Sequence, residues 1–67
     1  MKTPAERKLE AARLRVLACQ QRQNAAAHER QAGQPIYPGQ TMICLGKAAM
    51  LYALAARSEA AAAVLEE

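Results

Sequence analysis

The stretch that decides the fold is Gly33-Gln34-Pro35-Ile36-Tyr37-Pro38-Gly39-Gln40, which holds two of the three prolines and two of the three glycines in this 67-residue chain. Each proline disfavours helical backbone at the residue before it, so no helix can run through this stretch. The segments on both sides are rich in Ala, Leu, Glu, Gln and Arg, which favour helices. The sequence therefore predicts an all-α protein: a single helical hairpin with helices over about 4–32 and 41–65 and a turn over 33–40.

The start of the first helix has a clear signal in Thr3-Pro4-Ala5-Glu6. Thr3 can cap the free N–H groups of the first turn, proline suits the first helical position, and Glu6 completes a capping box. Gly33 is the expected stop. At helical spacing one apolar stripe is predicted to face the second helix: Ala5, Leu9, Ala12, Val16, Cys19, Gln23 and Ala27. Leu14 and Leu17 do not fit this stripe and suggest a second contact surface.

The second helix is apolar on nearly every side, which one partner helix cannot cover. One line holds Leu45, Ala49, Tyr52, Ala56 and Ala63, another Ile43, Met50, Leu54, Ala61 and Leu65, and a third Cys44, Ala48, Leu51, Ala55 and Ala62. The hairpin is therefore expected to dimerise into a four-helix bundle, with Leu51, Leu54, Ala55 and Ala62 at the dimer interface.

Antiparallel pairing of the two helices predicts a register in which the residue numbers of two facing positions add up to about 72. Leu9 then meets Ala63, Val16 meets Ala56 and Leu45 meets Ala27, so that large side chains oppose small ones. Gly46 lies inside the second helix, where glycine costs about 1 kcal/mol relative to alanine. Its presence there suggests the close approach of another backbone.

A chain of this size buries only about 60% of the surface that its unfolded form exposes, so a disulfide, a metal or oligomerisation is usually needed. Cys19 and Cys44 are expected at different levels of the hairpin, too far apart for a disulfide. Reduced thiols and the lack of a secretory signal predict a cytoplasmic protein. Lys47 and Arg57 interrupt the second apolar segment, and no membrane span is expected.

No catalytic set is visible in the sequence, which has no Asp and a single His28 without an evident partner. The spacing of His28 and the two cysteines does not suit zinc. There is also no glycine-rich phosphate loop. An enzyme is not expected, and neither is a metal or another cofactor.

Two features are candidates for partner binding. Lys8, Arg15 and Arg22 recur at seven-residue steps and are predicted to form a basic stripe on the outer face of the first helix. The stripe is either a solvated face, a protein contact or a phosphate contact. Ile36 and Tyr37, held between prolines, either fold back onto the hairpin core or form a rigid apolar tip that touches a partner.

The capped Thr3-Pro4-Ala5-Glu6 start, the Pro35–Gly39 turn and the Ala-rich second helix resemble the small bacteriophage anti-quorum-sensing proteins, which are two-helix dimers. The resemblance implies a homodimer that binds and inhibits a host protein, a quorum-sensing transcription regulator or a pilus-assembly ATPase. The layout also resembles the plasmid ROP type of four-helix-bundle dimer, which implies nucleic-acid binding as the alternative. The net charge of +3 argues against imitation of DNA.

Overall fold

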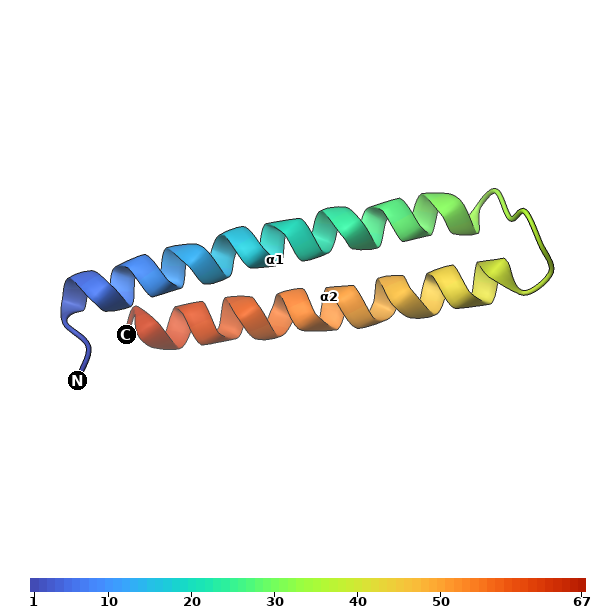
Figure 1. The fold of residues 1–67 in the computed structure, drawn as a ribbon. Coiled ribbons are helices and arrows are strands. Elements are labelled where there is room, and N and C mark those ends of the chain that lie inside the picture. Colours follow the sequence, from blue (N-terminus) through green and yellow to red (C-terminus); the bar gives the residue numbers. More distant parts are fainter.

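Two antiparallel helices make up most of the chain in the computed structural model, which describes residues 1–67. Helix α1 spans Pro4–Ala32 and helix α2 spans Gln40–Leu65. They lie side by side along their whole length, and both termini lie at the end opposite the turn (Figure 1). The Cα atoms extend over 51 × 14 × 13 Å, so the molecule is a rod. The all-helical hairpin predicted from the sequence is confirmed.

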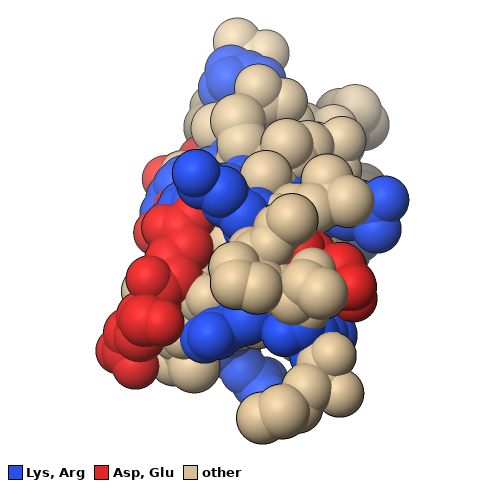
Figure 2. Space-filling view, turned by 90° about the vertical axis from the view of Figure 1, so that its left-hand side faces the viewer, with Lys and Arg blue, Asp and Glu red and all other residues tan.

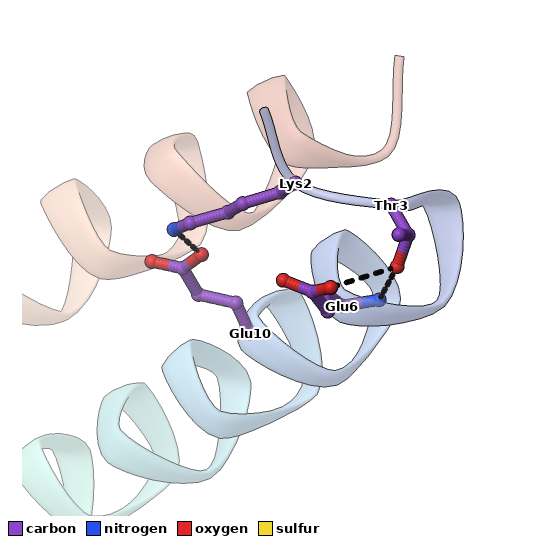
Figure 3. Close-up of polar contacts among 4 residues, drawn as sticks. All are labelled: Lys2, Thr3, Glu6 and Glu10. Carbon is purple, nitrogen blue, oxygen red and sulfur yellow. Dashed lines mark hydrogen bonds and ion pairs between the residues drawn. The ribbon is translucent and has the colours of Figure 1, made fainter.

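The N-terminus of α1 carries the predicted cap, with one difference in detail. The Glu6 backbone N–H donates to the Thr3 hydroxyl oxygen at 3.2 Å, and Pro4 occupies the first turn. The Glu6 carboxylate accepts a hydrogen bond from the Thr3 hydroxyl at 3.2 Å rather than from the Thr3 backbone N–H (Figure 3). A threonine cap of this kind contributes about 1 kcal/mol of helix stability.

The C-terminus of α1 lies at Gly33, as predicted, but not for the predicted reason. Gly33 has φ −76° and ψ −11°, a right-handed helical conformation that any residue can adopt. The helix ends here because Pro35 excludes helical backbone at the residue before it. The glycine that the turn requires is Gly39, whose φ of 86° lies in the left-handed region that favours glycine.

Hydrogen bonds fix the turn to both helices. The Thr41 hydroxyl donates to the Ala32 carbonyl oxygen at 3.0 Å and satisfies one of the carbonyls left free at the end of α1. The Gln40 side-chain oxygen accepts from the Ile36 backbone N–H, and the Gln40 backbone N–H donates to the Tyr37 carbonyl oxygen at 3.2 Å. The turn is therefore held at both of its ends.

The helices meet along a seam of small residues, and no large side chain is fully buried. The buried residues of α1 lie seven apart, at Ala11, Ala18, Ala25 and Ala32. Those of α2 are Cys44, Ala48, Ala55, Ser58 and Ala62. The seven-residue repeat, with three- and four-residue steps between the buried positions of α2, is the period of a coiled coil. Alanine at these positions lets the two backbones approach closely.

One polar contact lies inside the seam. The Ser58 hydroxyl is 3.1 Å from the Gln21 side-chain oxygen and 3.1 Å from the Leu54 carbonyl oxygen. Ser58 is only 9% exposed, so these oxygens replace the water that its hydroxyl loses on folding.

The prediction of which apolar stripe on α1 faces α2 is wrong. Leu9, Val16 and Leu45 are about half exposed, whereas Ala11 and Ala18 have no exposed surface. At 100° per residue, Leu9 and Val16 lie about 160–180° around the helix from Ala18, so α1 turns nearly the opposite face to α2 from the one predicted. The turned helix brings the small alanines to the contact and lets Arg15 and Arg22 reach α2. The alignment of the two helices along their axes is close to the predicted one. Thr41 lies level with Ala32, and their residue numbers add up to 73 where the prediction was 72.

The sequence suggested that another backbone packs closely against Gly46. Within the hairpin this prediction is wrong. A Cβ atom built on Gly46 would meet nothing within 4 Å. The glycine faces open space on α2, and its cost in helix propensity is not offset by any contact inside the chain.

Candidate interaction surfaces

One side of the seam carries polar contacts between the helices, repeated every seven residues on each helix. We call this side the polar flank; it consists of the pairs Arg15–Glu66, Arg22–Glu59 and Glu29–Tyr52. Arg15 binds both carboxylate oxygens of Glu66, with Nη2 at 2.7 Å from Oε2. This two-point geometry fixes the direction of the guanidinium as well as its distance.

These contacts change the titration of the groups that they join. The hydrogen bond from Arg15 is the largest cause of the lowered pKa of Glu66; burial opposes it, and the positive charges of Arg15 and Lys8 lower the pKa further. The hydrogen bond that Tyr52 donates to Glu29 raises the pKa of the phenol, because it is lost when the phenol ionises. Both pairs are solvent-exposed, so salt screens them.

The sequence predicted that the basic stripe would lie on the outer face of α1. In the structure it lies beside α2 instead. Arg15 and Arg22 reach across to glutamates of α2, and Lys8 lines a surface hollow with Glu66. In Figure 2, which shows the molecule from the end that carries both termini, basic and acidic groups lie next to one another. A phosphate would have to compete with these carboxylates. The role of the stripe in partner binding stays a prediction.

The apolar tip projects from the turn. Ile36 is 89% exposed and Tyr37 about half exposed, so the alternative in which they fold back onto the hairpin core is wrong. Met42, at the start of α2, is also exposed. The Gln40 contacts described above join the backbone of the tip to the start of α2. Its contact with a partner stays a prediction.

The residues predicted for the dimer interface divide into two groups. Ala55 and Ala62 have no exposed surface, because α1 covers them within one chain, so their assignment to a dimer interface is wrong. Leu51 is half-buried on the same side of α2. Leu54 is 38% exposed and is the member of the set that a second chain can reach most easily.

The sequence reasoning missed the seam of alanines and the glutamates that pair with the basic stripe. A signal for the seam was present, since Ala11, Ala18, Ala25 and Ala32 repeat at steps of seven. The second contact surface suggested for Leu14 and Leu17 stays a prediction. Both leucines line one shallow hollow together with Leu9, bordered by the Lys2–Glu10 ion pair (Figure 3).

The single histidine and the two cysteines differ in their burial. His28 Nδ1 is buried without a hydrogen-bond partner, Cys19 is exposed and Cys44 is buried, and both thiols are free. No group of three or more His, Cys, Asp or Glu side chains is placed to hold a metal ion.

Helix α2 is long and apolar enough to cross a membrane by length and composition, with a mean hydropathy of 1.3 over its most apolar window. Only 22% of that window is buried inside the hairpin. Most of the apolar surface of α2 is therefore available to a second protein or to lipid.

Comparison of the chain with protein-family models, with curated proteins and with solved structures gives no match. Its function is inferred below from the surfaces of the hairpin.

Proposed function

We propose that the chain is a non-catalytic protein-binding module, in which two hairpins pair into a four-helix bundle and present their tips, Ile36 and Tyr37, to a partner protein. One observation carries this proposal. The small residues lie inside the hairpin and most of the large apolar residues lie outside it, with no large side chain fully buried. A protein with this distribution needs a second apolar surface to cover it.

The exposed area supports self-association quantitatively. The hairpin exposes 5005 Å², whereas a compact monomer of its mass exposes only about 4100 Å². The excess, about 900 Å² per chain, is close to the roughly 800 Å² that each partner buries in a standard interface. A dimer with an interface of standard size would bury an area of about this size.

The partner of the bundle is proposed to be a protein rather than a nucleic acid. Two of the three cations of the basic stripe are occupied by glutamates of α2, whereas phosphate binding uses free Lys and Arg. The tip is apolar and exposed, which suits contact with a protein. Among host proteins, the resemblance to anti-quorum-sensing proteins makes a quorum-sensing transcription regulator the first candidate, and a pilus-assembly ATPase the second.

Sedimentation velocity at micromolar concentration tests the self-association. The expected particle has twice the 7.2 kDa of one chain, and a folded 7.2 kDa particle would refute it. Liposome flotation belongs in the same experiment, because stable insertion of α2 into vesicles would replace the dimer as the explanation of its apolar surface.

Capture from a bacterial lysate tests the tip. The wild-type protein is expected to retain one stoichiometric protein, and the Ile36→Ser/Tyr37→Ser variant to lose it. Val16→Ser changes an apolar residue away from the turn whose exposure lies between those of Ile36 and Tyr37; it is the control and should retain the partner. Capture of RNA or DNA alone, lost steeply as salt rises, would instead support the ROP-like alternative.

A further inference from the structure

We propose that the second copy of the chain docks on one particular side of the hairpin, which we call the apolar flank: Leu14, Leu17, Ile43, Met50 and Leu54. The inference rests on the proposed self-association and goes beyond it by assigning the face. The polar flank and the tip are left free.

The apolar flank lies across the seam from the polar flank. Leu17 is two residues from Arg15 along α1, which places the two side chains about 160° apart around the helix. Leu54 is five residues from Glu59, about 140° apart around α2. Each leucine directly precedes a fully buried alanine, Ala18 or Ala55, and is itself about 40% exposed. The two leucines thus border the seam on the side opposite the Arg15–Glu66 and Arg22–Glu59 pairs. The Lys2–Glu10 ion pair lies on the leucine side, at the N-terminal end of α1.

The flank extends along both helices. On α2, Met50 lies four residues before Leu54 and Ile43 lies seven before Met50, which keeps all three on one line of the helix. On α1, Leu14 and Leu17 line the same hollow, whose rim carries the charged side chains of Lys2, Glu6, Glu10 and Arg13. Lys47 and Arg57 also fall on this line of α2, where long side chains can lay their methylene stems along apolar surface and keep their charges in water.

A second copy fits this flank better than an unrelated partner does. The excess of about 900 Å² is present in every folded chain, so whatever covers it must be available wherever the chain folds. Another copy meets that condition, and lipid, the other apolar surface, is tested by the flotation experiment above. The polar flank is a poor alternative interface, because its carboxylates and guanidinium groups would lose water on burial.

Methionine oxidation in the wild-type protein tests the assignment without any substitution. Met50 on the apolar flank and Met42 near the tip are 67% and 77% exposed in the single hairpin, and exposure governs the rate of oxidation by peroxide. Trypsin cleaves at Lys47 between them, so mass spectrometry reads each methionine in its own peptide.

In the dimer we expect Met50 to oxidise roughly tenfold more slowly than Met42, and the difference to disappear on dilution to the monomer. Equal rates in a particle that sedimentation shows to be a dimer would overturn the assigned face and leave the self-association standing. A monomer at micromolar concentration would overturn both.

A pair of variants gives an independent test. Leu54→Glu puts a charge on the apolar flank, and Leu45→Glu puts the same charge on a similarly exposed leucine that lies on α2 near Tyr52 and the polar flank. Leu54→Glu is expected to weaken the dimer at least tenfold by sedimentation, and Leu45→Glu to leave it intact. The opposite order would overturn the proposal. Should Leu54→Glu fail to fold, as circular dichroism would show, the oxidation rates of the wild-type protein decide.

Discussion

Replacement of Ala18 by leucine tests the packing of the hairpin most directly. Ala18 has no exposed surface and lies in the middle of the seam. Leucine adds three carbon atoms where the two backbones are close, and overpacking of this kind typically costs about 1–3 kcal/mol. Since 1 kcal/mol shifts the melting temperature of a domain this small by about 4–8 °C, Ala18→Leu is expected to melt at least about 4 °C lower.

The assay is thermal unfolding followed by circular dichroism at one fixed protein concentration, because association makes the melting temperature concentration-dependent. Ala12→Leu is the matched control. It makes the same chemical change at an exposed position of α1, where substitutions usually stay within about 0.5 kcal/mol. Ala12 belongs to the apolar stripe predicted from sequence alone, so the two variants distinguish the two interfaces. A lower melting temperature for Ala12→Leu, with Ala18→Leu unchanged, would refute the alanine seam.

Four further variants test local features of the hairpin. Gly39→Ala should cost about 1–2 kcal/mol in urea unfolding, because φ at Gly39 is 86°, whereas Gly46→Ala should gain about 1 kcal/mol at its open helical position. Glu29→Ala, which removes the acceptor, should bring the raised pKa of Tyr52 back towards its ordinary 10.0, measured by phenolate absorbance at alkaline pH. The lowered pKa of Glu66 means that its contribution to stability is complete above the unfolded value of 4.5 and is lost as pH falls through the folded value; in Glu66→Gln, urea midpoints above and below pH 4.5 should differ less than in the wild type.

The helices and the turn could be predicted because their signals are local. Thr3, Pro4 and Glu6 lie within one turn of helix, and Pro35 acts on the residue next to it. Such signals depend on the chain immediately around them, so tertiary packing had little opportunity to override them.

The interface of the helices could not be predicted in the same way. The sequence reasoning gave weight to Leu9 and Val16 because large side chains bury more area, but a two-helix contact can instead favour the closest approach of the backbones, which alanine allows. The glutamates that pair with Arg15 and Arg22 could not be predicted for a different reason. Glu66 lies 51 residues from Arg15 in the sequence. The rotation of α1 about its own axis, which brings the two side chains together, depends on the packing of the seam.

The even spacing of the alanines has a consequence for how the two helices are aligned. If α1 slid by seven residues, about 10.5 Å, each of its alanines would take the place of the next, and the seam would pack almost as well. The short turn between the helices, the Thr41–Ala32 hydrogen bond and the Ser58–Gln21 contact therefore select one alignment. A few residues inserted between Pro35 and Pro38 would give the chain enough slack to settle one heptad out of step, with Arg15 beside Glu59.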